Sequence, residues 1–578
     1  MTPEFLPTTA DEIKRLGWER PDIILFSGDA YVDHPSFGAA VIGRVLQAEG
    51  YKVAIVPQPN WQDDLRDFKK LGKPRLFFGV SPGAMDSMVN HYTAARRLRH
   101  DDAYTAGGKH GRRPDYPSIV YTKILKDLYP DVPVVLGGIE ASLRRVAHYD
   151  YWEDRLRPSI LQDSDADMLI YGMGERPIAE IARRLDAGEP IEALKDVRQT
   201  ALFTTEKPGE DDIVLAPYAE CLKSKKKQIE NFKLVEIESN KPVGKTIWQE
   251  TNGKMLKINP PFPPISTEAL DKIYKLPYTR LPHPRYKGKT IPAFEMIKDS
   301  VTMHRGCYGG CAFCTIAAHQ GKTISSRSKE SVIDEVKKIA EIPGFKGYVS
   351  DLGGPSANMY MTGGKRKEIC EKCTKPSCLH PTVCKNLDTD HRKLLDLYKE
   401  VDALPEIKKA FVGSGVRYDL AMAPTGDRKK DKTNREYIEQ LISRHVSGRL
   451  KVAPEHTEDK VLNLMRKPSF EQFEEFNRIF KSVNGKYKLN QQLIPYFISS
   501  HPGCTDKDMA NLAAKTRKLN FRLEQVQDFT PTPMTLATEM YYAGINPYTG
   551  EKVWTARSPR EKEKQKEYFF WYKKPQRR

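Results

Sequence analysis

The sequence predicts an α/β protein: a Rossmann-like parallel sheet followed by a partial (β/α)6 barrel. Two observations predict this class. Short apolar runs that end in glycine or polar residues alternate with amphipathic helical stretches, first near the N-terminus and again from about residue 298. Such alternation is typical of parallel sheets with crossover helices. The second block holds about six strand–helix units, fewer than the eight of a closed barrel.

The first block occupies residues 1–190. Strands are expected at 21–27, 51–57, 74–80, 132–136 and 167–171, with helices at 37–49 and 177–185. Ligands of such sheets bind at the carboxyl ends of the strands. No G-x-G-x-x-G opens the first helix, so the usual dinucleotide-binding signal is missing from the sequence.

Residues 191–295 separate the two blocks and differ from them in composition. They are rich in Lys, Glu and Pro, and four prolines lie between Pro260 and Pro264. This composition predicts a linker with some structure of its own.

The second block occupies residues 296–550. Strands are expected at 300–305, 346–352, 409–413, 449–453, 488–498 and 522–528, and helices at 331–342, 391–403, 434–444, 470–481 and 506–518. Capping boxes predict two of the helix starts, Thr433 with Glu436 and Ser469 with Gln472. A cysteine-rich insertion, 362–390, interrupts the block. Residues 551–578 are basic and predict a flexible tail.

Composition limits the choice of partner and compartment. The formal charge is +17 and the pI about 9.2, which fits a polyanionic partner such as RNA, or a basic surface kept for solubility. No run of about 18 apolar residues occurs, so we expect no membrane span. The first thirty residues lack an apolar stretch with a cleavage site, so we expect no signal peptide and a cytoplasmic location. There, clustered cysteines bind metals or catalyse reactions.

Cys307, Cys311 and Cys314 form the strongest signal, a C-x3-C-x2-C triplet directly after a predicted strand. Soft thiolates favour iron–sulfur clusters, zinc or copper(I). A cubane cluster needs four ligands, and this loop offers three, so one iron would stay open to a substrate or cofactor. The alternative is a zinc site completed by a distant ligand such as His304 or His319.

Four more cysteines lie close together in the insertion: Cys370, Cys373, Cys378 and Cys384. They predict a closed metal site with four thiolate ligands, and both structural zinc and an auxiliary iron–sulfur cluster stay open. A complete ligand set favours a structural or electron-relay role. Cys504, at a predicted strand end, is either a loop residue or a thiol for radical chemistry.

The C-x3-C-x-aromatic-C loop after a first barrel strand resembles the signature of the radical S-adenosylmethionine (SAM) superfamily. Four further segments at strand ends resemble the YgiQ family of that superfamily: DLGGPSANMY at 351–360, GSGVRY at 413–418, VAPEH at 452–456 and SHPGC at 500–504. The resemblance spans nearly the whole chain. It implies the fold and the cofactor far more closely than the substrate.

The resemblance implies roles for individual residues. In the superfamily the three cysteines bind a [4Fe–4S] cluster, the open iron takes the amino and carboxylate groups of SAM, and reduction yields a 5′-deoxyadenosyl radical. Gly353 and Gly354 resemble the pair that approaches the SAM amino group, although Pro355 stands where the family-wide pattern has Glu. Contacts to the SAM carboxylate or ribose are implied for Ser414, Arg417 and Glu455. A hydrogen-bonded strand end is the alternative role of Ser414 and Arg417.

The N-terminal sheet resembles the cobalamin-binding-like domain that precedes some radical SAM barrels. Its loop ends match at Gly137-Gly138 and at 172–175. The Asp-x-His-x-x-Gly signature is absent, and Asp33-His34 with Gly38 is a near miss. Bound cobalamin, a different ligand and no ligand all stay open.

Two classes of function follow. The first is a radical SAM enzyme that takes electrons from a one-electron reductant such as flavodoxin or ferredoxin and modifies RNA, protein or a small molecule. The second is a zinc-containing nucleic-acid-binding protein without catalysis, which the second cysteine group, the positive charge and the aromatic residues 568–572 favour.

Overall fold

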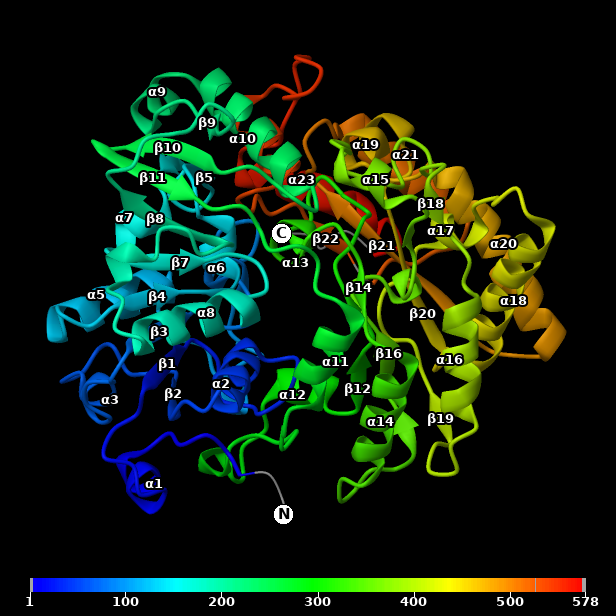
Figure 1. Cartoon of the computed structure of the whole chain (residues 1–578). Coiled ribbons are helices and arrows are strands. Elements are labelled where there is room, and N and C mark those ends of the chain that lie inside the picture. Colours follow the sequence, from blue (N-terminus) through cyan, green and yellow to red (C-terminus); the bar gives the residue numbers. More distant parts are fainter. Residues whose placement is uncertain (1–3, 525, 574–578) are drawn as a thin grey trace. The chain divides into compact units, whose positions relative to one another are not determined.

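A computed structural model describes residues 4–524 and 526–573, which fold into two compact units (Figure 1). The N-terminal unit comprises Met1–Pro263, Lys272–Lys298 and Thr532–Met534, and the barrel unit comprises Pro264–Asp271, Asp299–Pro531 and Thr535–Arg578. Within the described residues, no helix is both long and apolar enough to span a bilayer.

The N-terminal unit is built on a nine-stranded sheet of order β2-β1-β3-β4-β7-β8-β11-β10-β9. Its first five strands are parallel and match the predicted ones: β2 (Val53–Pro57), β1 (Ile23–Ser27), β3 (Phe77–Ser81), β4 (Val134–Leu136) and β7 (Met168–Ile170). Their order is that of a doubly wound, flavodoxin-like sheet. The predicted fold class of this part is therefore confirmed.

Helices on both faces explain why the first strands are apolar throughout. Alternate residues of β1 enter different cores: Ile23 and Leu25 pack with α2 (Gly38–Ala48) and α8 (Glu175–Asp186), and Ile24 packs with α5 (Pro117–Leu128). A strand covered on both sides has no polar face, so its sequence is a continuous apolar run.

The expected linker at 191–295 is instead part of the sheet. It contributes β8 (Thr200–Thr204), β9 (Ile213–Val214), β10 (Ile247–Thr251) and β11 (Lys254–Ile258), with β8 antiparallel to both β7 and β11. The helices α9 (Tyr218–Lys223) and α10 (Lys225–Ser239) join β9 to β10. Composition was misleading here because one face of α10 is exposed, so its lysines and glutamates alternate with buried apolar residues.

The rest of the N-terminal unit consists of short elements. These are α1 (Ala10–Arg15), α3 (Arg66–Lys69), α4 (Ser87–His91), α6 (Gly138–Leu143), α7 (Ile160–Ser164), α12 (Pro292–Ile297), and the antiparallel pair β5 (His148–Asp150) and β6 (Arg155–Arg157). The helix α11 (Thr267–Lys275) contains residues of both units.

The barrel unit contains the six predicted strand regions in two groups. In the first group β12 (Ser300–Thr302) pairs with β16 (Asp351–Gly353), and β15 (Tyr348–Val349) pairs with β19 (Lys409–Ala410). In the second, β21 (Gln492–Ser499) lies between β20 (Arg449–Glu455) and β22 (Val526–Asp528). All four pairings are parallel. The intervening helices are α14 (Lys329–Ala340), α16 (Arg392–Asp402), α18 (Arg428–Arg444), α20 (Phe470–Tyr487) and α21 (Asp506–Lys518).

One of the two helix starts predicted from capping residues is displaced, and the other is confirmed. The helix α18 begins earlier than expected, because Asp427 caps it by accepting a hydrogen bond from the Lys429 N–H at 2.8 Å. The Thr433 hydroxyl bonds back to the Lys429 carbonyl inside the helix. The helix α20 does begin after Ser469, which accepts from the Glu471 N–H.

The C-terminal segment is not a free tail over its described part. It contains α22 (Leu536–Ala543) and α23 (Pro559–Glu567), and Ser558 and Glu561 form a capping box at the start of α23. Phe569 is fully buried, and Trp571 Nε1 donates to Thr516 Oγ1 of α21 at 3.2 Å. The aromatic residues therefore anchor this segment to the barrel unit. Residues 574–578 lie outside the described part.

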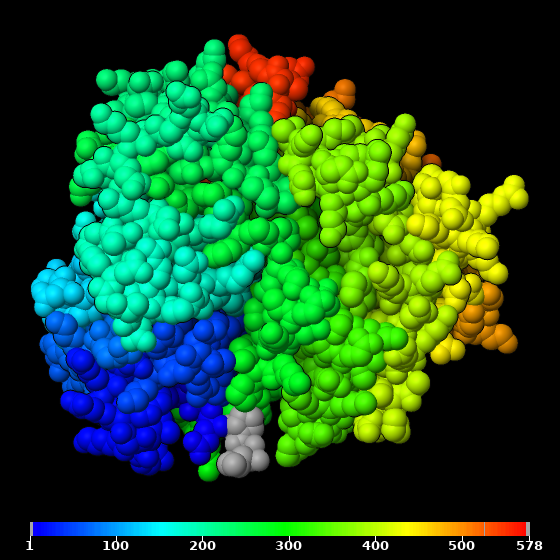
Figure 2. Space-filling view, in the orientation of Figure 1, coloured from blue at the N-terminus to red at the C-terminus, as the bar shows by residue number. Residues whose placement is uncertain are grey.

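The cysteine-rich insertion is a largely irregular segment of the barrel unit. The short strands β17 (Gly363–Gly364) and β18 (Leu387–Asp388) pair antiparallel near its two ends, and α15 (Lys367–Glu371) lies between them. Figure 2 shows this segment, in yellow-green, at the surface.

Candidate cluster and cofactor site

The loop that carries the cysteine triplet follows β13 (His304–Arg305) and precedes α13 (Ile316–Gln320). Backbone hydrogen bonds close its base, since the Cys307 N–H donates to the Gly321 carbonyl at 3.1 Å. Gly306 has φ +86°, and a Cβ there would lie 2.2 Å from the Thr323 carbonyl oxygen. Glycine is thus required at the point where the strand turns into the loop.

The three thiols suit a cluster by their chemistry. Burial raises the pKa of Cys307, with a further contribution from Cys311, and the same two causes raise the pKa of Cys314 to about 12. Such thiols stay protonated until a metal displaces the proton. No three His, Cys, Asp or Glu side chains within residues 4–524 and 526–573 are grouped to hold one metal ion. A [4Fe–4S] cluster does not need the three sulfurs to surround one ion, because each thiolate binds a different iron.

Arg417 places a buried cation beside this loop. Its Nη1 lies 3.6 Å from Cys311 Sγ, while its Nε donates to Asp419 Oδ1 at 2.8 Å. Asn358 fixes the Arg417 backbone from both sides, accepting from its N–H and donating to its carbonyl, each at 2.9 Å. A cation in this place stabilises negative charge on the cysteine sulfurs.

Gly353 and Ser414 lie together at the carboxyl ends of β16 and β19. The Asp351 carboxylate accepts hydrogen bonds from the Gly413 N–H at 2.8 Å, from the Ser414 N–H at 3.0 Å and from the Ser414 hydroxyl. A Cβ at Gly353 would lie 2.2 Å from Ser414 Oγ. Any larger residue would therefore break this junction.

Gly354 packs against an imidazole ring. A Cβ there would lie 2.4 Å from the His304 ring, and His304 is fully buried. Burial lowers the pKa of His304 to about 4, so the ring is neutral at neutral pH. Gly353 and Gly354 thus connect the Asp351 junction to the strand that leads into the cluster loop.

Glu455 ends β20 in a strained conformation. Its φ is +69°, and the register with β21 shifts between Val452 and Glu455. A bulge of this kind re-aims a side chain. Burial raises the pKa of the Glu455 carboxyl, Lys467 lies 3.7 Å away, and the carboxylate is near enough to raise the pKa of Cys314. Glu455 therefore lies within electrostatic range of Cys314.

The four cysteines of the insertion lie within electrostatic range of one another, although within the described residues no three of them are grouped around a single ion position. Burial raises the pKa of Cys378 to about 11, the Lys322 ammonium lowers it, and the other three thiols raise it. Lys322 Nζ lies 3.9 Å from Cys373 Sγ, and Asn386 Nδ2 donates to Cys370 Sγ at 3.4 Å. Four thiolates around a divalent metal carry excess negative charge, which a buried ammonium and an amide donor offset.

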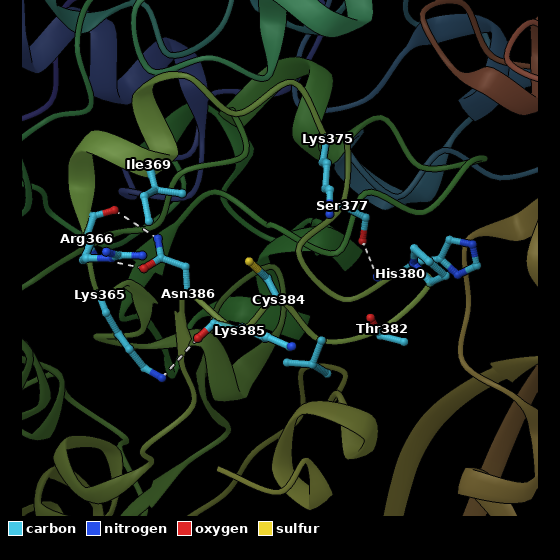
Figure 3. A pocket seen from close by; sticks show the side chains of 12 residues that line it. Lys365, Arg366, Ile369, Lys375, Ser377, His380, Thr382, Cys384, Lys385 and Asn386 are labelled. Atoms are coloured by element: carbon cyan, nitrogen blue, oxygen red, sulfur yellow. Dashed lines mark hydrogen bonds between the residues drawn. The ribbon is translucent and has the colours of Figure 1, made fainter. Parts of the chain in front are cut away.

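A cationic cavity of about 610 Å³ adjoins this second group (Figure 3). Cys384 and the apolar residues Ile369 and Val383 contribute to its wall. Its charged lining residues are Lys365, Arg366, Lys375 and Lys385, while burial lowers the pKa of the lining residue His380. Among the described residues that line it, none is Asp or Glu, so the cavity favours an anionic ligand.

Sequence reasoning missed a buried histidine–cysteine pair. Cys504 Sγ lies 3.4 Å from His456 Nε2, and the Glu458 N–H donates to His456 Nδ1, which leaves the ring proton on Nε2 facing the sulfur. From α23, Gln565 accepts from the Ser500 N–H and donates to the Cys504 carbonyl, both at 2.8 Å. His456 and Cys504 each follow a predicted parallel strand. Because parallel strands end at the same edge of a sheet, the sequence could have indicated that these two residues lie close together.

Asp33 and His34, the near match to the cobalamin-binding signature, bond to other side chains of the N-terminal unit. Asp33 forms an ion pair with Arg44, and both side chains are buried. His34 Nδ1 accepts from the Ser36 N–H at 3.1 Å, and its Nε2 lies 2.8 Å from an Arg280 nitrogen. A ring with both nitrogens occupied is not free to ligate cobalt. These residues do not fit a histidine-ligated cobalamin, so we derive no step through that cofactor.

Three family models match successive parts of the chain. Residues 301–515 match the radical SAM superfamily, residues 5–300 match the radical SAM N-terminal domain, and residues 524–577 match a domain of unknown function, DUF3362. The chain is therefore a radical SAM enzyme, a class that uses a [4Fe–4S] cluster and SAM.

Full-length relatives narrow the family. The UPF0313 protein of Bacteroides thetaiotaomicron is 61% identical over 100% of this chain and 95% of its own length. That of Porphyromonas gingivalis is 62% identical over 99% and 91%, and YgiQ of Escherichia coli K12 is 44% identical over 96% and 82%. The chain belongs to the UPF0313 family, which includes YgiQ. The predicted resemblance is confirmed.

A weak match among solved structures is TsrM from Kitasatospora setae, a radical SAM methyltransferase with cobalamin and a [4Fe–4S] cluster bound. It has a TM-score of 0.46 and 13% identity, covering 89% of this chain and 77% of that one.

Proposed function

We propose that Cys307, Cys311 and Cys314 hold the [4Fe–4S] cluster with which this enzyme cleaves SAM. The observation that carries the proposal is the placement of the three cysteines in one glycine-shaped loop beside a buried arginine, with Arg417 Nη1 3.6 Å from Cys311 Sγ. When bound, the cluster would supply the electron that splits SAM into methionine and a 5′-deoxyadenosyl radical.

The chain's own residues position the cofactor and balance its charge. Gly353 and Gly354 allow the end of β16 to pack closely against Ser414 and His304, and this packing would hold the backbone that faces the SAM amino group. Ser414 and Glu455 supply polar groups for the carboxylate or ribose, and Arg417 offsets negative charge on the cysteine sulfurs. Asp419 holds the guanidinium in place.

An external one-electron donor, such as a flavodoxin or ferredoxin, would reduce the cluster. The four cysteines of the insertion would hold a second metal, either zinc or an iron–sulfur cluster, in a closed site. Lys322 and Asn386 support this assignment because each contacts a sulfur atom of the group.

The experiment is anaerobic reconstitution followed by iron and sulfide analysis and a dithionite assay for 5′-deoxyadenosine. We expect about four irons per chain at the triplet and loss of 5′-deoxyadenosine in the variants Cys307→Ala, Cys311→Ala and Cys314→Ala. Cys221→Ala, in the N-terminal unit, is the matched control and should retain turnover. Zinc without iron, and no cleavage, would reject the proposal and favour the binding protein without catalysis.

We further propose that the substrate is an RNA. Two observations support it over a protein: the formal charge of +17, and the cavity in the insertion whose charged lining residues are all basic. Phosphate contacts would supply the binding free energy and make it dependent on salt.

Charge-matched variants test this proposal. The triple variant Lys365→Ser, Arg366→Ser, Lys385→Ser should weaken RNA binding by about tenfold or more and flatten its salt dependence. The control removes three exposed lysines of the N-terminal unit: Lys223→Ser, Lys226→Ser, Lys227→Ser. Equal losses in both variants would mean nonspecific attraction. No RNA binding by the wild-type chain would favour a protein substrate.

A further inference from the structure

We infer that the second cysteine site fixes the shape of the loop that holds the catalytic cluster. Within the barrel unit, the segment 375–380 of the insertion lies directly on the loop 306–314, and the two are joined by hydrogen bonds, close backbone contact and shared apolar packing. The inference rests on the proposed function, because it assigns the insertion a role toward that cluster.

Ser377 makes the first connection. Its hydroxyl donates to the Gly309 carbonyl at 2.6 Å, and the same oxygen accepts from the N–H groups of Leu379 and His380, each at 3.0 Å. Ser377 is 4% exposed. The buried Ser377 hydroxyl therefore stabilises the turn around Cys378 and is also hydrogen-bonded to the cluster loop between Cys307 and Cys311.

The backbones of the two loops touch next to this hydroxyl. The Cys378 N–H donates to the Tyr308 carbonyl at 3.0 Å, so a ligand of one site is bonded to the neighbour of a ligand of the other. Gly310 has φ +60°, and a Cβ there would lie 2.3 Å from the Pro376 carbonyl oxygen. The loops can approach this closely only because residue 310 has no side chain.

Apolar side chains from both loops share a small core. Tyr308 packs with Leu379 and Leu387 of the insertion, together with Met359 and Leu420. Cys307, Cys378 and Cys384 border this core. The Tyr308 hydroxyl is hydrogen-bonded to Thr362 Oγ1 at 2.8 Å, so the tyrosine reaches the start of the insertion.

Lys322 makes a connection from the other side. It follows the cluster loop in the chain and is 8% exposed, and its ammonium group donates to the Lys375 carbonyl and lies 3.9 Å from Cys373 Sγ. Tyr308, near the start of the cluster loop, and Lys322, beyond its end, therefore both contact the segment that carries the second cysteine site.

A bound metal would supply the rigidity that the secondary structure of the insertion does not provide. The insertion has only short helical and strand elements, so little regular structure holds its turns. A metal bound by four cysteines contributes its binding free energy to folding. With that metal in place the 375–380 turn is rigid and orders the cluster loop, and without it both segments loosen together.

Hydrogen exchange on the anaerobically purified chain tests the coupling. In Cys373→Ser and Cys378→Ser we expect loss of the second metal, amide exchange at least about tenfold faster across 306–314, and less iron at the triplet after reconstitution. Exchange in β20 and β21 of the barrel unit should stay unchanged, which shows that this unit has folded. Loss of the second metal with unchanged exchange across 306–314 would overturn the inference.

A variant that keeps all four cysteines separates coupling from metal loss. Ser377→Ala should retain the second metal and still accelerate exchange across 306–314, while Ser469→Ala, which removes a helix cap elsewhere in the barrel unit, should not. Unchanged exchange in Ser377→Ala also overturns the inference. Failure of the proposed function is distinguishable, because it appears as absent iron at the triplet in a wild-type chain whose exchange still responds to the second metal.

Discussion

Arg417 and Asp419 form a buried ion pair whose guanidinium also faces Cys311 Sγ, so charge balance at the cysteine loop depends on a carboxylate that touches no cysteine itself in the part of the chain described. The Nη2–Oδ2 distance is 2.5 Å, and both side chains are at most 10% exposed. A buried pair of this kind is far more sensitive to loss of one partner than to loss of both.

We therefore predict that Arg417→Ala destabilises the chain by about 3–5 kcal/mol, because it leaves the Asp419 carboxylate buried and unpaired. The double variant Arg417→Ala, Asp419→Ala should be more stable than Arg417→Ala alone. Denaturant titration of both variants measures the difference. Additive losses in the double variant would show that the two side chains are not coupled.

Gly353→Ala should weaken SAM binding. A Cβ at this position would meet Ser414 Oγ at 2.2 Å and Asp351 Oδ2 at 2.3 Å, so the end of β16 has to move. Gly363→Ala is the control, because its Cβ would have no heavy atom within 4 Å. Calorimetric titration of SAM into the reconstituted protein should show a loss of about tenfold or more for Gly353→Ala alone. Equal affinities would separate Gly353 from the SAM site.

The buried His456 side chain should make the folded chain less stable in acid. Burial lowers its pKa to about 4 in the folded state, below the 6.5 of an exposed imidazole. The unfolded chain therefore binds the proton first, and stability falls as the pH drops from about 6.5 towards 4. The contribution is roughly 3 kcal/mol when complete. In His456→Gln the slope of unfolding free energy against pH should be smaller in this window, and an unchanged slope would exclude the histidine as its source.

Gln565 predicts that α23 stabilises the end of β21. Its amide joins the Ser500 N–H and the Cys504 carbonyl, and the residue is fully buried. In Gln565→Leu both backbone groups lose their partner, so we expect a loss of about 2–4 kcal/mol in thermal or denaturant unfolding. Glu563→Leu, a nearby substitution on the same helix, controls for changes in helix propensity. Similar stabilities of the two variants would contradict the role of Gln565.

The sequence predicted those parts of the fold that depend on local pattern. Continuous apolar runs such as 21–27 identified the strands buried on both faces, and the spacing of the cysteines identified both groups. It failed at 191–295 because the exposed side chains of α10 and the loops give this region the composition of a linker, although most residues of β8 and β10 are buried. It also failed at residues 551–573, where the packing of Phe569 and Trp571 depends on surfaces formed by distant segments.

The candidate site shows the same division. Residue types and spacing identified the ligands, but contacts between distant segments were not encoded in any local pattern. Ser377 on Gly309 joins residues 68 positions apart, and Cys504 beside His456 joins residues 48 apart. Parallel strands bring their carboxyl ends to one edge of the sheet. This predicts which residues lie in the same region, but not which of them touch.

The left-handed backbone of Glu455 has a consequence for directed evolution. A side chain with a Cβ at φ +69° is strained, and glycine or asparagine would adopt this conformation more easily. A library selected only for heat resistance should therefore be enriched in the substitutions Glu455→Gly and Glu455→Asn. A library selected for turnover should retain the carboxylate, and position 455 would then mark where durability and activity demand different residues.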